Sequence, residues 1–416
     1  MFSSHYIKFL VCFTLITPLS SQAQTLKELL ELFSSNNNLI KSATYESKSK
    51  EQAMQAQKST YYPTLDLGAF YQRLDDRTFL VPGDIYRGYA KLSLDVYDGG
   101  KRSATLSQKQ KELQSSKYDQ EGLKKSIALS IVEDFYTLKN LQASLKALLQ
   151  AQESLQAQLQ RVTKFYEANV ATKDDVDKLQ SVYDSNIYTV DSLHFQIFSL
   201  KKTLELKVGT EIENLEDAHF LKNTKETFEP LETTKALIAK KESLENAAKS
   251  LQSVYYPHIS VEDTYSFSAY GRTDALHPEG LDKQNKLLLT LNMRLYDNAS
   301  ISKTKESVLL SSYALHEQVI YKNKEQKLQY ELSLQRIKTS YSKIKSAKSA
   351  LNSAKSAFKS IEKKYNAGIV DNVAFLDALS VLKNAQAQYE ISLHDLEVAY
   401  AIYYFYSGED LVEYLQ

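Results

Sequence analysis

Residues 61–100 read YYPTLDLGAFYQRLDDRTFLVPGDIYRGYAKLSLDVYDGG, and two stretches of this segment alternate apolar with polar side chains. In the first stretch, 64–74, the apolar side is Leu65, Leu67, Ala69 and Tyr71, and the other side includes Asp66, Gly68, Phe70 and Gln72. In the second stretch, 88–97, the apolar side is Ala90, Leu92, Leu94 and Val96, opposed to Lys91, Ser93 and Asp95. The period of two predicts a hairpin of two strands over 64–97, each with one apolar face, followed by a turn at Asp98-Gly99-Gly100.

The same plan occurs a second time further along the chain. Tyr61-Tyr62-Pro63 returns 194 residues later, and both Tyr97-Asp98 and the segment 166–170 return 199 residues later, as Tyr296-Asp297 and 365–369. Three landmarks in one order predict a duplicated unit with a second hairpin over 258–296. Its last strand has an apolar side that we expect to face lipid: Leu287, Leu289, Leu291, Met293 and Leu295.

Long helices are predicted between the hairpins and after them. Residues 102–166 hold no proline and a single glycine, which predicts a helix of about 65 residues and roughly 98 Å. Its counterpart is 301–365, and shorter helices are expected over 173–207 and 373–406, with others over 26–60 and 232–254. Two short helices placed end to end match one long helix, which favours a wall of even thickness over a globule.

These elements divide the chain into segments. We expect a signal peptide over 1–23, a first repeat over 24–208, a connector over 209–231, a second repeat over 232–408 and a short tail over 409–416. The connector is either a linker or a small structured element at the waist. Lys8, the apolar run 9–19 and Ser21-Gln22-Ala23 are typical of a cleaved export signal, and Cys12, the single cysteine, lies within it.

Composition argues against several classes of function. The chain has 51 basic and 51 acidic residues, so nothing indicates nucleic-acid binding. Its seven histidines show no pair at helical ligand spacing, and no phosphate loop or nucleophile motif is present, so we expect no metal, no cofactor and no enzyme. Tyrosine is abundant, at 29, and tryptophan is absent, so tyrosine would supply any interfacial anchors in a membrane.

Four strands of about ten residues have the length and period of transmembrane β-strands. Four strands cannot close a barrel, so the barrel would be shared: two chains give eight strands, three give twelve, and only twelve leave an opening. Two alternatives stay open. The hairpins could pack on the chain's own helices, or the chain could be an exported structural or adhesive coiled-coil protein without a pore.

The chain resembles the TolC-like outer membrane efflux family. The resemblance is carried by the tandem repeat, the Tyr-Pro before each first strand, the exit at 97–100, and the segments 165–171 and 365–371 with 375–379 after them. It implies a mainly α fold with a transmembrane β portion: a homotrimer with a 12-stranded β-barrel, four strands per chain, continuous with a 12-helix periplasmic α-barrel. It further implies the outer membrane of a Gram-negative bacterium, a periplasmic adaptor (membrane fusion) protein, and an inner-membrane RND or ABC pump that energises efflux or type I secretion through a passive duct.

The breaks between long and short helices are the predicted tips of the molecule. Asn169 and Gly368 suit left-handed geometry at a helix end, and Thr172 with Asp175 suits an N-terminal capping pair. By resemblance, the adaptor would dock at Asn169, Val170, Ala171, Thr172, Ala367, Gly368 and Ile369. Acidic residues near the tips are either solvated helix-start carboxylates or a selectivity gate around the mouth, with Asp377 the main candidate beside Asp371, Asp174 and Asp175.

Overall fold

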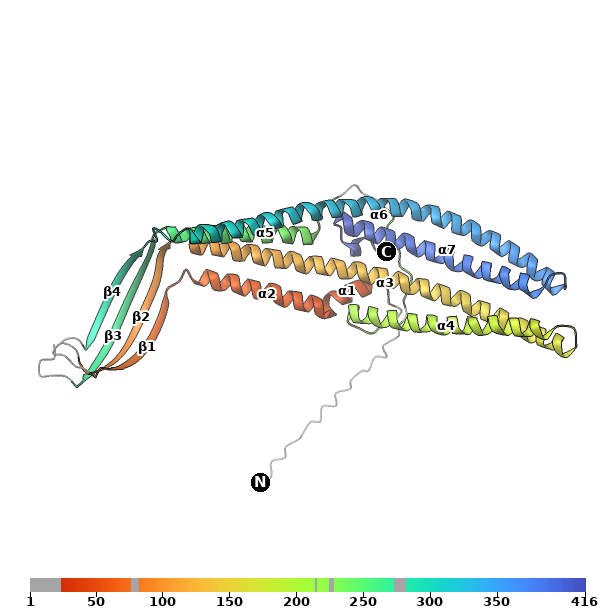
Figure 1. The fold of residues 1–416 in the computed structure, drawn as a ribbon, viewed down its shortest axis with the longest axis horizontal. Helices are drawn as coiled ribbons and strands as arrows, with labels where there is room; N and C mark the ends of the chain where they lie inside the picture. Colours follow the sequence, from red (N-terminus) through yellow and green to blue (C-terminus); the bar gives the residue numbers. More distant parts are fainter. Residues whose placement is uncertain (1–23, 76–81, 214, 224–227, 273–281) are drawn as a thin grey trace, which may run out of the picture.

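The structure, a computed structural model, describes residues 24–75, 82–213, 215–223, 228–272 and 282–416. The predicted signal peptide and Cys12 lie outside the described residues. The molecule is elongated, with a β-sheet at one end, helical turns at the other end and the C-terminus near the middle (Figure 1). The prediction of a mainly α fold with a small β portion is confirmed.

Seven α-helices in the described chain build most of the length. They are α1 (Leu26–Asn36), α2 (Asn38–Ser59), α3 (Lys101–Glu167), α4 (Lys173–Val208), α5 (Glu232–Gln252), α6 (Ser300–Asn366) and α7 (Asn372–Ser407). The long helices α3 and α6 have 67 residues each. Short 3-10 turns follow α5 (η1, Ser253–Tyr255) and α7 (η2, Leu411–Tyr414).

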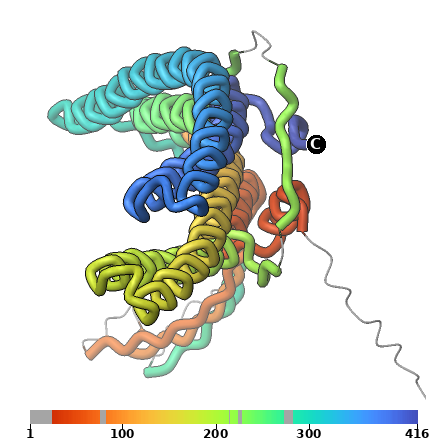
Figure 2. Tube along the Cα trace, turned by 90° about the vertical axis from the view of Figure 1, so that its right-hand side faces the viewer, coloured from red at the N-terminus to blue at the C-terminus, as the bar shows by residue number. Residues whose placement is uncertain are grey.

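The helices form a curved wall. Between the sheet and the waist, contacts run in the order α2, α3, α5, α6, and between the waist and the tips in the order α4, α3, α7, α6. Seen end on, these rows follow an arc instead of closing into a bundle (Figure 2). The wall therefore has two lateral edges, one formed by α2 and α4 and the other by α6.

The predicted continuous helix over 26–60 is wrong, because Asn37 interrupts it. The Asn37 side chain accepts hydrogen bonds from the backbone N–H groups of Leu39 and Ile40 and so starts α2. Its Nδ2 donates to the carbonyl of Lys207 at 2.6 Å, in the last turn of α4. The break thus lets one residue cap two helices where they meet at the waist.

The four strands form one antiparallel sheet in the order β1 (Thr64–Arg73), β2 (Asp84–Asp98), β3 (His258–Gly271), β4 (Lys283–Asn292). The two hairpins are joined by the pairing of β2 with β3. The outer edges of β1 and β4 have no strand partner in the described chain.

Several strand limits differ from the prediction. β2 begins at Asp84, four residues before the predicted start, because its first residues pair with both β1 and β3. β4 ends at Asn292, so Met293 and Leu295 lie beyond it. The last β4 residue is opposite His258, the first residue of β3, and Pro257 before it cannot donate to a ladder.

The connector is structured at the waist. Leu215 pairs with Gln24, and Phe220 pairs with Leu415 of the tail. The carboxylate of Glu397, on α7 and almost fully buried, accepts a hydrogen bond of 2.8 Å from the Phe220 backbone N–H. The Phe220 ring joins a core of apolar side chains from α1, α3, α4 and α7, so the connector packs on both repeats.

Candidate functional site

The strand register gathers apolar side chains on one face of the sheet. Leu65, Leu92, Asp263 and Leu287 form one row across the four strands, and Leu94, Val261 and Leu289 form another. We call this the apolar sheet face; its members are Leu65, Leu67, Ala69, Tyr71, Tyr86, Ala90, Leu92, Leu94, Ile259, Val261, Tyr265, Phe267, Leu287, Leu289 and Leu291.

The apolar sheet face is open. Leu287 is 72% exposed and Leu291 64% exposed. The predicted face residues Leu287, Leu289 and Leu291 share it, whereas Met293 and Leu295 are exposed but lie after the end of β4. Its rows also hold three polar side chains: Asp263 opposite Leu287, and Asn285 and Lys283 opposite Tyr265 and Phe267 at the start of β4. A continuous exposed apolar surface of this kind indicates a contact with lipid or protein.

The opposite face of the sheet is polar and makes hydrogen bonds. Arg87 Nε donates to Ser268 Oγ at 2.9 Å, and both Ser266 and Ser268 are buried. Lys91 and Glu262 form an ion pair at 3.8 Å. A sheet with one apolar and one polar side fits a boundary between lipid and water.

Arg272, just after β3, clamps the far end of the sheet. Its guanidinium donates to Asp84 Oδ2 at 3.0 Å and to the carbonyls of Leu74 and Gly83 at 2.9 and 3.1 Å. These contacts tie the two hairpins together. Our sequence analysis missed Arg272, since nothing in a one-dimensional pattern brings it to the first hairpin.

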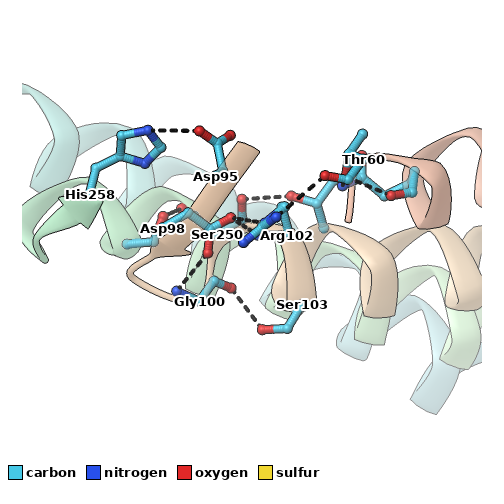
Figure 3. A network of polar contacts seen from close by, with 11 residues as sticks. Thr60, Asp95, Asp98, Gly100, Arg102, Ser103, Ser250 and His258 are labelled. Atoms are coloured by element: carbon cyan, nitrogen blue, oxygen red, sulfur yellow. Dashed lines mark hydrogen bonds and ion pairs between the residues drawn. The ribbon is translucent and has the colours of Figure 1, made fainter. Parts of the chain in front are cut away.

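The strands enter the helices through a polar junction (Figure 3). Asp98 accepts hydrogen bonds from the backbone N–H and the Nε of Arg102, at 2.8 and 3.0 Å, and Arg102 also donates to the Thr60 carbonyl. His258 and Asp95 pair across β2 and β3 at 3.2 Å. The contacts of Arg102 therefore tie the end of β2 and the residue after α2 to the start of α3.

The second repeat has a matching junction. Asp297 accepts from the Ile301 backbone N–H at 3.0 Å and from the Tyr255 hydroxyl at 2.8 Å. Asp98 and Asp297 thus both start a long helix, which explains why the Tyr-Asp landmark occurs twice.

Both tips are built from the residues that the sequence singled out. Asn169 has φ 58° and Gly368 φ 72°, so each takes the left-handed conformation that ends a long helix. Thr172 and Asp371 follow as N-caps of α4 and α7. Val170 and Ile369 are 75% and 72% exposed, and the structure places an apolar side chain at each tip.

Three of the four candidate acids are engaged in helix starts. Thr172 donates a side-chain hydrogen bond to Asp175, which holds the pKa of that carboxyl below its ordinary value. Asp371 Oδ1 accepts from the Ala374 N–H at 3.0 Å, and Asp174 pairs with Lys178 at 2.6 Å. Asp377 is exposed, and the described residues offer it no hydrogen bond or ion pair.

Arg161 joins the two tips, a role that our sequence analysis missed. Its guanidinium lies 5.3 Å from the ring centroids of Phe165 and Tyr365 and donates to Asn366 Oδ1 at 2.8 Å. The spacing of Arg161 and Phe165 by four residues is the only local signal of this contact.

None of the described helices combines the length and the hydropathy needed to cross a bilayer. No group of His, Cys, Asp or Glu side chains in the described ranges is arranged to hold a metal ion.

Comparisons with known proteins agree with this geometry. The outer membrane efflux protein family matches residues 29–186. Among curated proteins, none is similar enough in sequence to count as a match.

Several solved structures share the fold. The CmeC outer membrane channel of Campylobacter jejuni has a TM-score of 0.81 at 16% identity, covering 92% of this chain and 85% of that one. The outer membrane protein VceC of Vibrio cholerae has 0.75 at 16%, covering 93% and 96%. The open-state MtrE outer membrane channel of Neisseria gonorrhoeae has 0.78 at 11%, covering 93% and 89%. The outer membrane efflux protein family thus matches the chain over 29–186, and nearly the whole chain shares the fold of these outer membrane channels.

Proposed function

We propose that three copies of this chain form an exit duct across the outer membrane of a Gram-negative bacterium and into its periplasm. The observation that carries the proposal is the apolar sheet face, whose unpaired edges β1 and β4 continue directly into the edges of the helical wall. The sheet and the wall thus have their unpaired edges on the same two sides of the molecule, as one segment of a closed cylinder would.

Closure sets the number of copies. An open sheet edge cannot face lipid, because its N–H and C=O groups would lack partners. Four strands per chain give twelve in a trimer, and a barrel of that size leaves a passage where eight strands would fill it with side chains. The helices of three curved walls would then enclose a tunnel, lined by polar residues and continuous with the barrel.

The duct is proposed to be passive. We assign no catalytic role to any residue, and the driving force would come from an inner-membrane RND or ABC pump in efflux or type I secretion. A periplasmic adaptor would bridge pump and duct by docking at the tips, where Val170 and Ile369 expose apolar side chains that a partner could cover.

The test is reconstitution of the purified protein in planar lipid bilayers. We expect a heat-dissociable trimer in detergent and stepwise conductance increments in the bilayer. A chain that stays monomeric and soluble without detergent would contradict the proposal and favour the exported coiled-coil alternative. A trimer that gives no conductance would support the assembly but contradict the proposed function as a duct.

A further inference from the structure

The repeat makes the β2–β3 pairing inside one chain a template for the pairing between chains. Resting on the proposed trimer, we infer that β4 pairs with β1 of a second copy in a register that places Arg294 directly opposite the second copy's Asp66. The resulting ion pair would lie on the polar side of the sheet, close to the junction with the helices.

The template is given by the contacts within the chain. In the β2–β3 ladder, Asp95 lies opposite Ser260 and Leu94 opposite Val261. Asp95 also makes the cross-strand contact to His258 at 3.2 Å. This end of the internal seam thus already uses a charged side chain to hold two strands together.

The repeat offsets convert this register into the intermolecular one. A shift of 199 residues carries β2 onto β4, as Tyr97-Asp98 shows, and a shift of 194 carries β3 onto β1, as the Tyr-Tyr-Pro segments show. Asp95 opposite Ser260 becomes Arg294 opposite Asp66 of the second copy. Leu94 opposite Val261 becomes Met293 opposite Leu67.

The two charges fit this placement. Asp66 and Arg294 are both exposed, and neither makes a hydrogen bond or a close ion pair with the described residues of its own chain. Arg294 does interact electrostatically with Asp297 of its own chain, at the junction with α6. Both belong to the polar alternation, since Leu65 and Leu67 flank Asp66 and Met293 and Leu295 flank Arg294. Residues directly opposite in an antiparallel ladder bring their Cβ atoms to about 5 Å, within reach of an Arg–Asp pair.

Other registers lose this match. A slip of one residue would turn the leucines of β4 to the polar side of the neighbouring strand. A slip of two would keep the faces but set Arg294 opposite Thr64 or Gly68, neither of which carries a charge. The ion pair therefore selects one register among those that the pleat allows.

The same mapping accounts for two groups of exposed side chains. Positions 293–297 correspond to the end of β2 that pairs only with β3, so Met293 and Leu295 would become strand residues once a second copy is present.

On the helices, the contact of His394 with Asn140 at 2.6 Å maps onto Phe195 and Thr339 of adjacent copies. Phe195 is 71% exposed on α4, and this contact would cover it.

A disulfide experiment tests the register. In full-length protein with Cys12→Ser, the pair Arg294→Cys and Asp66→Cys should form disulfide-linked chains in the membrane under mild oxidation, detected on non-reducing gels. The pair Arg294→Cys and Thr64→Cys, displaced by two residues on the same face at an exposed position, should link much less. Preferential linking of the displaced pair would overturn the inferred register while leaving the trimer intact.

Charge reversal tests the ion pair. Asp66→Arg or Arg294→Asp alone should lower the temperature at which the trimer dissociates in detergent, and the two together should restore it. Lys286→Asp, on the same face of β4 but mapped opposite Leu74, is the matched control and should change it little. Equal effects of the single and double variants would refute the pairing, whereas a wild-type chain that never trimerises would refute the proposed function itself.

Discussion

Two residues in the left-handed conformation lead into each long helix. In the first repeat they are Gly99 and Gly100, at φ 67° and 86°, and in the second repeat they are Asn298 and Ala299, at φ 55° and 62°. A left-handed alanine has its Cβ close to the following carbonyl oxygen, whereas glycine has no such clash. The second repeat thus keeps the turn geometry of the first with a less favourable residue.

Ala299→Gly should therefore stabilise the assembled protein by about 1 kcal/mol, because it removes this clash. The measurement is thermal or denaturant unfolding in detergent. Gly100→Ala is the mirror variant and should destabilise by a similar amount, since a Cβ there meets no atom nearer than 3.7 Å and only the backbone preference changes. A stabilising Gly100→Ala would contradict the assignment of left-handed geometry.

At the scale of elements, the apolar sheet face gives a directional prediction. Leu291→Lys should cost roughly 2–4 kcal/mol per chain if the side chain lies near the middle of the bilayer, because a charge would enter lipid. Asn292→Lys changes the next residue, whose side chain is on the polar face, and should be tolerated. The amount of heat-dissociable trimer in outer membrane fractions measures both. Normal assembly of the Leu291 variant would reverse the assignment of the faces.

The first turn of α4 gives a second prediction. Thr172 and Asp175 form a capping box, in which each side chain accepts a hydrogen bond from the backbone of the other. Thr172→Ala should cost about 1 kcal/mol of local stability, seen as faster amide hydrogen exchange in that turn. Thr172→Ser keeps the hydroxyl and is the control; if it exchanges as fast as the alanine variant, the cap is not what stabilises the turn.

The cap should also respond to pH. The pKa of Asp175 is lowered in the folded chain, chiefly by the Thr172 side-chain hydrogen bond. Its contribution to stability is therefore complete above the ordinary aspartate pKa of about 4 and is lost as the pH falls through the lowered value. Asp175→Asn should remove this acid-dependent part of the hydrogen-exchange protection.

The elements differ in how far sequence could predict them. The long helices can be predicted because 102–166 lacks proline and helix-breaking turns. The tips can be predicted because Asn169 and Gly368 mark the ends of the two long helices. The break at Asn37 cannot be predicted in this way, because the asparagine is held there by the Lys207 carbonyl, 170 residues away in the sequence. Arg272 and the β2–β3 pairing also depend on contacts between repeats, which periodicity within one segment does not encode.

At the scale of the whole molecule, the duplication decides the architecture. Each repeat supplies two strands, one 67-residue helix and one tip, and the pairing of β2 with β3 sets the two repeats side by side. If copies of the repeat are joined one after another by this same pairing, an unpaired edge is left until the last copy pairs with the first. The connector and tail at the waist, tied to α7 by Glu397 and to each other by Phe220 and Leu415, are where this regular plan is interrupted.

The proposed trimer would place three copies of Asp377 around the mouth of the tunnel at the tips. Because Asp377 has no cation beside it among the described residues, its charge would be available to ions in the proposed tunnel, whereas Asp174 is paired with Lys178. Asp377→Asn should therefore weaken the preference for cations, measured as a reversal potential closer to zero in a salt gradient across a planar bilayer.

Asp191→Asn, an exposed position on α4 well away from the tips, removes the same charge and should leave the potential nearly unchanged. An unaltered reversal potential in the Asp377 variant would exclude it from the mouth, and an equal shift in both variants would point to a general charge effect along the tunnel instead of a ring at the tips.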